Sequence, residues 1–364
     1  MLLRKVQEIA EEALEQGVGS ALGIGWHHQG LAETLTLGQT ALEPFPHQPV
    51  TAQTPFDLAS LTKPMATVTL LAQELTKERL NLQDRLDQHL PLAIDTALGP
   101  RTLGQLLSHT SGAVAWRDFA LATQELNGQP RIQAVQQLVL NTPLETEPGT
   151  QATYSDLGFL ALGWLLEEVT QLPLDQLFAE RVARPLGLTA QYRRLSLSLD
   201  DALNCVATEI WPQRQQNLPL QGQVHDDNAA ALDGVAGHAG LFATVSDVLQ
   251  WSIQWLHLVQ GQETPLEIAP LLAHMLVTTP GCPHTSWRHG WDTPTQPGSS
   301  AGQLAPQDAF GHLGFTGTSV WLSPQRDAAG VLLTNRVHPT RESVQGIRAL
   351  RPRLYDALWR NLSL

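Results

Sequence analysis

A chain of 364 residues, 42% of them hydrophobic, is long enough to bury a sizeable core in two domains or in one domain with an insertion. Its 35 acidic residues outnumber its 22 lysines and arginines, which gives a formal charge of −13. This balance argues against nucleic acid and anionic membrane surfaces as partners, because both are bound through basic surfaces.

The N-terminal segment predicts an amphipathic helix and not an export signal. Charged residues interrupt it every few positions, so it lacks the apolar centre of a signal peptide. Its apolar residues mark one helix face, namely Val6, Ile9, Ala10, Ala13 and Leu14. No apolar run reaches the roughly 18 residues that a membrane-spanning helix needs. We therefore expect a soluble, cytoplasmic protein.

Strand patterns occur near both ends of the chain. Residues 20–37 predict two strands joined at an HHQG stretch, and residues 314–335 predict two more around a turn. Residues 343–362 predict a closing helix despite an interior proline. Strands and helices at both termini indicate one discontinuous α/β domain, assembled from residues 1–75 and 230–364.

The middle of the chain has helical spacing that proline and glycine interrupt. This pattern predicts a mostly helical domain over residues 76–229, inserted into the α/β domain. Residues 218–244 and 281–309 are expected to be long loops. Loops of such length in a compact domain tend to be functional or disordered.

Ser60 and Lys63 form an SxxK pair where a helix is expected to begin. Pro64 places that start near Ser60, because proline is tolerated in a first turn but clashes in a helix interior. Burial would lower the pKa of Lys63. A neutral amine near the Ser60 hydroxyl could accept its proton and make the serine a nucleophile. The pair alone equally fits a helix cap with an outward-pointing lysine.

Two further motifs follow. Tyr154 lies between a turn and a long apolar helix, where its phenol could relay protons to a leaving group or simply pack against the helix start. His312 and Gly314 are expected to begin a strand whose small residues let a substrate approach the backbone. An N–H of that strand could complete an oxyanion hole with the N–H of Ser60. A glycine-rich edge strand with an incidental histidine is the alternative.

The order SxxK, YxD and HxG before a C-terminal strand pair resembles the serine β-lactamase and penicillin-binding-protein superfamily. It is most similar to the class C β-lactamase-related serine hydrolases, which include esterases, D-aminopeptidases and DD-peptidases. Further similar stretches are LLSHTSG (106–112), EPGTQATYSDLGF (147–159), GVAGHAGLFATVSDV (234–248) and LLTNRVHP (332–339).

The resemblance implies an α+β fold of the β-lactamase/transpeptidase type, with terminal helices on one face of an antiparallel sheet and a helical domain on the other. It implies Ser60 as the acylated nucleophile, Lys63 as its proton acceptor and Tyr154 as the partner base or acid. His312 takes the place of the lysine of a KTG motif, and the amides of Ser60 and Phe315 form the oxyanion hole. No cofactor is implied.

Two departures from that family bear on the substrate. Asp156 stands where many class C enzymes have asparagine, and its carboxylate would repel a substrate carboxylate or pair with Lys63. His312 removes a permanent positive charge. We therefore expect an esterase or amidase type of hydrolase, acting on small-molecule esters, amides or D-amino-acid peptides, with weak or absent β-lactamase activity.

Two alternatives come from other classes. One is a non-hydrolytic ligand sensor or binding module on the same fold, which would be acylated without turnover. The other is a metal enzyme, for which HDD (225–227), His238 and the pair His27–His28 are candidate ligands. None of them has HExxH-type spacing, so no catalytic metal is expected.

Overall fold

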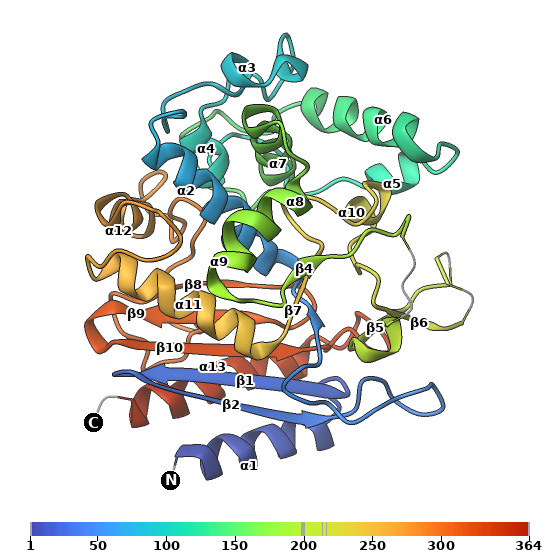
Figure 1. Ribbon diagram of the computed structural model, residues 1–364, viewed down its shortest axis with the longest axis vertical. Coiled ribbons are helices and arrows are strands. Elements are labelled where there is room, and N and C mark those ends of the chain that lie inside the picture. Colours follow the sequence, from blue (N-terminus) through green and yellow to red (C-terminus); the bar gives the residue numbers. More distant parts are fainter. Residues whose placement is uncertain (1, 198–200, 213, 216, 363–364) are drawn as a thin grey trace.

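A five-stranded antiparallel sheet joins the two ends of the chain, in the order β2-β1-β10-β9-β8 (Figure 1). The computed structural model describes residues 2–197, 201–212, 214–215 and 217–362. The strands are β1 (Ala21–His28), β2 (Leu31–Gly38), β8 (Phe310–Leu313), β9 (Ser319–Ser323) and β10 (Ala328–Thr334). The pairing of β1 with β10, from Leu22↔Thr334 to His28↔Ala328, confirms the predicted assembly of N- and C-terminal strands.

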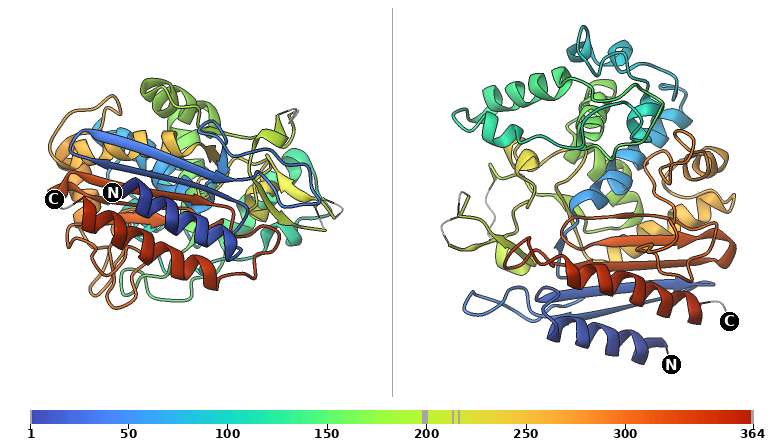
Figure 2. Two further views of the ribbon diagram at one scale, coloured as in Figure 1. Left: turned by 90° about the horizontal axis from the view of Figure 1, so that it is seen from below. Right: turned by 180° about the vertical axis from the view of Figure 1, so that it is seen from behind.

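Two terminal helices cover one face of this sheet, α1 (Leu2–Glu15) and α13 (Gln345–Asn361) (Figure 2). The predicted apolar face of α1 is largely buried, and α13 continues through Pro352 as expected. Leu22, Ile24 and Trp26 of β1 alternate toward these helices, as a strand with period two requires. The terminal layer therefore has a core of its own.

The opposite face of the sheet carries α11 (Val245–Val259), with α12 (Pro270–Thr278) beside it. Neither helix was predicted from the sequence. Gly23 and Gly25 of β1 allow the close approach, because a Cβ at either position would lie 3.1–3.3 Å from a side-chain carbon of Val245. Nine residues of α11 are buried, so its apolar side is broader than a simple amphipathic stripe.

On the side of α11 that faces away from the five-stranded sheet, the molecule is mostly helical (Figure 1). The central one is α7 (Asp156–Thr170), in which residues 157–166 are all buried. The others are α2 (Thr69–Thr76), α3 (Leu86–His89), α4 (Leu103–Leu107), α5 (Phe119–Ala122), α6 (Gly128–Asn141), α8 (Leu174–Phe178), α9 (Arg184–Leu186) and α10 (Asp227–Ala231). No helix in the described parts of the chain is long and apolar enough to cross a membrane.

Small sheets connect the two sides. β3 (Phe56–Asp57) and β4 (Gln191–Tyr192) flank β7 (Leu241–Ala243), and β5 (Ala207–Ile210) pairs with β6 (Pro219–Gln221). The segment 218–244 is therefore not the long loop expected from sequence, since it contains β6, α10 and β7. These elements have only three to five residues each, too few for a local period to show. β7 is also paired with β3 and β4, which lie far away in the chain.

The expected strand start at His312 and Gly314 is also wrong. His312 lies near the end of β8, and Gly314 begins the turn to β9. A Cβ at Gly314 would lie 2.0 Å from Thr318 Oγ1 and 2.6 Å from the carbonyl oxygen of Leu58. Glycine is required because this turn presses against the segment that precedes Ser60.

Candidate active site

Ser60 lies in a 3₁₀ turn (Ala59–Leu61) that follows β3 and leads into a π-helical turn (Lys63–Val68) and α2. The buried carboxylate of Asp57 holds this turn by accepting the N–H of Ala59 at 2.8 Å and that of His225 at 2.7 Å. Burial raises the pKa of Asp57, although these bonds oppose the rise. Ala59 has φ = 47°, a strained value for alanine, so the local chain is held by its surroundings.

The Lys63 side chain is completely buried. The carbonyl oxygen of His238 lies 3.5 Å from its Nζ, and three other oxygen atoms are closer. They are Ser60 Oγ at 2.9 Å, Tyr154 Oη at 2.7 Å and Asp156 Oδ1 at 2.6 Å. Three acceptors match the three N–H groups of an ammonium. The structure therefore brings together the SxxK pair, Tyr154 and Asp156, including the contact between Lys63 and Asp156 that the sequence suggested.

The expectation that Lys63 is a neutral amine in the free protein is wrong. Burial favours the neutral form, but the charge of Asp156, together with Tyr154, outweighs it and raises the pKa of Lys63 above its ordinary value. Burial also raises the pKa of Tyr154, against the opposing effect of Lys63. The resting site thus contains an ammonium–carboxylate pair beside a neutral phenol.

His312 is buried and uncharged. Its Nδ1 lies 2.9 Å from the carbonyl oxygen of Leu313, which can only accept, so Nδ1 carries the proton. Burial, and then the nearby Lys63, lower its pKa to about 3. The absence of a permanent charge at this position agrees with the sequence analysis.

Other aromatic side chains pack near His312. Trp287 lies with its ring 5.7 Å from His312, 5.0 Å from Tyr154 and 4.6 Å from His109. The N–H of Ser155, next to Tyr154, donates to His109 Nδ1 at 3.1 Å. The sequence analysis assigned no role to His109, although it lies in the LLSHTSG stretch. Trp287 comes from the 281–309 segment and had no local signal.

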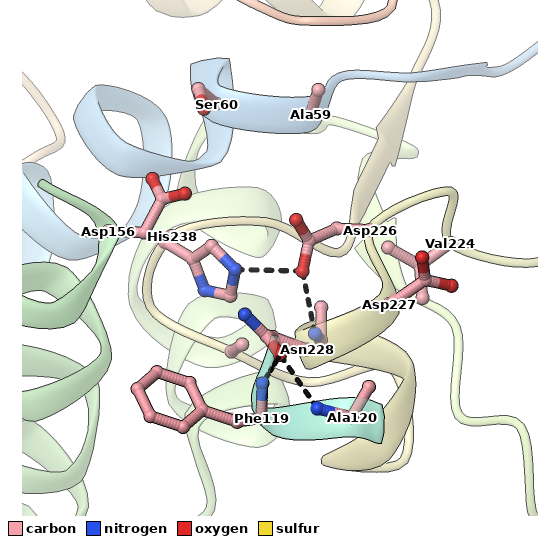
Figure 3. Close-up of polar contacts among 12 residues, drawn as sticks. Ala59, Ser60, Phe119, Ala120, Asp156, Val224, Asp226, Asp227, Asn228 and His238 are labelled. Carbon is pink, nitrogen blue, oxygen red and sulfur yellow. Dashed lines mark hydrogen bonds and ion pairs between the residues drawn. The ribbon is translucent and has the colours of Figure 1, made fainter. Parts of the chain in front are cut away.

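Figure 3 shows the loop that closes the other side of the site. His238 Nε2 lies 2.9 Å from Asp226 Oδ1. Burial by itself would raise the pKa of Asp226, but the contact with His238 outweighs this effect and holds that pKa well below its usual range. The amide oxygen of Asn228 accepts the N–H groups of Phe119 and Ala120, each at 3.0 Å. These bonds attach residues 225–228 (HDDN) to helix α5.

Asp156, Asp226 and His238 place three ligand atoms within 4.8 Å of one another, a spacing that suggests a metal site. The Lys63 ammonium, however, lies 2.6 Å from Asp156 Oδ1. A metal cation bound there would lie beside this ammonium and repel it. The cluster therefore fits a lysine counter-ion better than a metal.

A cavity of about 770 Å³ opens at these residues. Ser60, Tyr154, Asp156, His312, Gly314 and Phe315 line it, whereas Lys63 lies behind this surface. All seven predicted site residues thus meet at one place.

Four arginines line the same cavity, Arg336, Arg341, Arg348 and Arg351. Arg341 is paired with Glu209, whereas the other three, here called the arginine wall, form no ion pair with any residue that the structure describes. Burial lowers the pKa of Arg351 to about 10, which still leaves it charged near neutral pH. The wall was not predicted from sequence.

Two members of the arginine wall hold the β8–β9 turn. Arg351 donates to the carbonyl oxygen atoms of Gly314 at 2.9 Å and Thr318 at 2.8 Å. Arg336 donates to that of Phe315 at 2.8 Å and lies over its ring at 4.5 Å from the centroid. His312 carries no permanent charge, but Arg336 and Arg351 place positive charge beside the same cavity.

Comparison with known proteins places these features in a family context. A family model described as Beta-lactamase matches residues 12–353. A provisionally named D-alanyl-D-alanine carboxypeptidase of Escherichia coli K12 is 31% identical over 318 residues, covering 80% of this chain and 71% of that protein. An N-acetylmuramyl-L-alanine amidase of Bacillus subtilis is 29% identical over 319 residues, covering 79% and 69%.

Solved structures share the fold. EstCE1, described as a hydrolase with promiscuous acyltransferase activity, superposes with a TM-score of 0.76 at 22% identity over 98% of both chains. A class C beta lactamase superposes with a TM-score of 0.72 at 16% identity, also over 98% of both chains. The predicted β-lactamase/transpeptidase architecture is thereby confirmed.

Proposed function

The chain belongs to the beta-lactamase family of serine hydrolases, and on that premise we propose that it acylates Ser60 with amides or esters that carry a carboxylate near the scissile bond. The observation that carries the proposal is the chain of contacts from Ser60 Oγ through Lys63 Nζ to Tyr154 Oη, at 2.9 and 2.7 Å, on the wall of the cavity. Nucleophile, base and proton relay are within hydrogen-bonding distance in this arrangement.

Acylation begins with a proton shift inside the ion pair. Substrate excludes water from the cavity, which favours transfer of a proton from Lys63 to Asp156 across 2.6 Å and leaves a neutral amine. Lys63 then takes the proton of Ser60 while Ser60 Oγ bonds to the carbonyl carbon. Tyr154 donates a proton to the leaving group as its bond to that carbon breaks. Lys63 re-protonates Tyr154, and water later cleaves the acyl-enzyme.

The developing oxyanion lies between the backbone N–H groups of Ser60 and Phe315. Peptide N–H groups fixed before the reaction stabilise this charge without reorganisation. Arg351 supports the arrangement because it binds the carbonyl oxygen of Gly314, which belongs to the same peptide unit as the Phe315 N–H.

The arginine wall favours an anionic substrate. These guanidinium groups have no carboxylate partner among the residues that the structure describes, so on a chain of charge −13 they offer a local site for a carboxylate. The relatives named D-alanyl-D-alanine carboxypeptidase support peptides of this type, because a carboxypeptidase releases the residue that carries the terminal carboxylate. Arg336, Arg348 and Arg351 also weaken the argument that the replacement of the KTG lysine by His312 excludes carboxylate-bearing substrates.

The test is a matched pair of acyl-D-alanyl-D-alanine peptides, one ending in a carboxylate and one in an amide. We expect kcat/KM for the acid to exceed that for the amide by tenfold or more, since a charge-assisted hydrogen bond is worth about 1.5–3 kcal/mol. Arg348→Gln should reduce this preference, whereas Arg360→Gln, an exposed arginine on the same helix, should not. Equal rates for the two peptides would refute the substrate class.

Intact-mass spectrometry tests the nucleophile separately. The wild-type protein should turn over an activated ester, and Ser60→Ala should neither turn it over nor gain acyl mass. Lys63→Ala should lower turnover about a hundredfold or more, as loss of a positioned base does. A stable adduct without turnover in the wild type would favour the ligand-sensor alternative.

A further inference from the structure

Three metal-ligating side chains meet on the sheet, outside the cavity described above. They are His27 on β1, His257 near the end of α11 and Asp327 in the turn between β9 and β10. One ligand atom from each lies within 4.8 Å of the other two. None of the three lines the active-site cavity.

The packing of α11 on β1 brings the two histidines together. Gly23, Gly25 and His27 alternate toward α11 on the strand. Val245 and Leu249 of α11 cover the two glycines, and His257 lies two turns beyond Leu249 on the same helix. The rings of His27 and His257 lie 6.4 Å apart at an interplanar angle of 82°.

His27 is buried, yet it has no hydrogen-bond partner among the residues that the structure describes. Its side chain is 4% exposed, and neither ring nitrogen forms a hydrogen bond with any described residue. The nearest carboxylate atom, Asp327 Oδ1, is 3.6 Å from Nε2, which exceeds hydrogen-bonding distance. A buried polar group without a partner calls for a bound water or ion, because leaving it unsatisfied destabilises the fold.

A hydrogen bond from a neighbouring glutamine holds Asp327 in a position suited to a metal ligand. Gln260, one turn beyond His257, donates to Asp327 Oδ1 at 3.1 Å and to the carbonyl oxygen of Pro324 at 3.0 Å. Such bonds orient a carboxylate, as in protein metal sites. Oδ1 also faces His27, and a carboxylate oxygen that accepts one hydrogen bond still has a lone pair for an ion. The side chain of Asp327 is 34% exposed, so solvent reaches the cluster.

We propose that His27, His257 and Asp327 bind one first-row divalent transition metal ion of the zinc type. Two imidazoles and one carboxylate are ligands that Zn²⁺ and Co²⁺ prefer, with water completing the coordination. Metal–ligand bonds of about 2.0–2.2 Å require the three groups to draw closer. His257 and Asp327 are only partly buried and can rotate to do so. The ion links β1, α11 and the β9–β10 turn, so its role is structural and independent of Ser60 chemistry.

The experiment uses the full chain after dialysis against a chelator, titrated with Co²⁺ and Zn²⁺. We expect one equivalent of Co²⁺ to bind with visible d–d absorption, and Zn²⁺ to displace it and raise Tm, because an ion that binds only the folded state stabilises it. His257→Gln should weaken Co²⁺ binding at least tenfold. His274→Gln, an exposed histidine on α12, should leave it unchanged.

Asp327→Asn provides a second test that is expected to preserve folding. Asp327 has φ = 47°, which asparagine tolerates, and its amide oxygen can still accept from Gln260. This variant should also weaken Co²⁺ binding at least tenfold. Equal affinity in wild type, His257→Gln and Asp327→Asn, or no binding to the wild type, would overturn the proposal.

Discussion

Asp156 makes the largest contribution to keeping the amine next to Ser60 charged. Lys63 is buried in a setting that by itself favours a neutral amine, and one carboxylate at 2.6 Å reverses that preference. The proposed mechanism therefore starts from a proton shift within a pair, and Asp156 becomes a participant in it.

Replacing this carboxylate should change the pH dependence of acylation. In Asp156→Asn, burial is no longer opposed by a negative charge, so the pKa of Lys63 should fall and the neutral amine should appear at lower pH. We expect the rising limb of the rate of acylation by an activated ester to shift to lower pH. Asp95→Asn, an exposed site, should leave the limb in place. An unshifted limb in Asp156→Asn would contradict the role given to this pair.

At the scale of elements, one hydroxyl joins α2 to α11. Thr69 Oγ1 accepts the indole N–H groups of Trp251 at 3.2 Å and Trp255 at 3.1 Å, and donates to the carbonyl oxygen of Pro64 at 2.9 Å. All three side chains are completely buried. The helix that follows Ser60 is thereby attached to the helix that covers the sheet.

Thr69→Val should test this attachment. Valine preserves the shape but leaves two buried indole N–H groups without an acceptor, at about 1–3 kcal/mol each. We expect the free energy of unfolding, measured with urea, to fall by about 2–6 kcal/mol. Thr278→Val, whose hydroxyl binds only a carbonyl of its own exposed helix turn, should change it by less than about 0.5 kcal/mol. Similar losses in both variants would contradict the argument.

Most elements with a regular local pattern were predicted. Helices α1, α7 and α13 and the strand pairs β1–β2 and β9–β10 are confirmed. Their signals are local, either one apolar face, as in α1, or a continuous apolar run, as in α7 and β10. β8, α11 and the short elements within 218–244 were missed, since tertiary contacts stabilise them more than local pattern does. The division into residues 1–75 plus 230–364 and an insertion at 76–229 stays a prediction.

For the whole molecule, buried histidines link stability to pH. Burial lowers the pKa of His312 to about 3 and that of His289 to about 4, from 6.5. Below pH 6.5 the unfolded chain binds protons at these histidines that the folded chain does not. The free energy of unfolding is therefore highest above pH 6.5 and decreases as the pH falls toward 4.

Urea unfolding between pH 7.5 and 4.5 should show this loss. His289→Gln removes one group that binds a proton only in the unfolded chain. The slope of the unfolding free energy against pH should therefore decrease by up to about 1.4 kcal/mol per pH unit. The exposed His274→Gln should leave the slope unchanged. A slope that His289→Gln does not alter would mean that this histidine is protonated in the folded state as well.

The sequence by itself selected the residues proposed for the chemistry and, in large part, the type of element that holds each one. Ser60, Lys63, Tyr154 and His312 could be selected because each lies in a short local motif, and because the order of these motifs resembles that of a known family. Only the tertiary structure decided the charge of Lys63, the arginine wall, the contact with Trp287 and the His27 cluster. These depend on distances between groups far apart in the chain, 93 residues for Lys63 and Asp156, and both electrostatic energy and burial follow distance in space and not order in sequence.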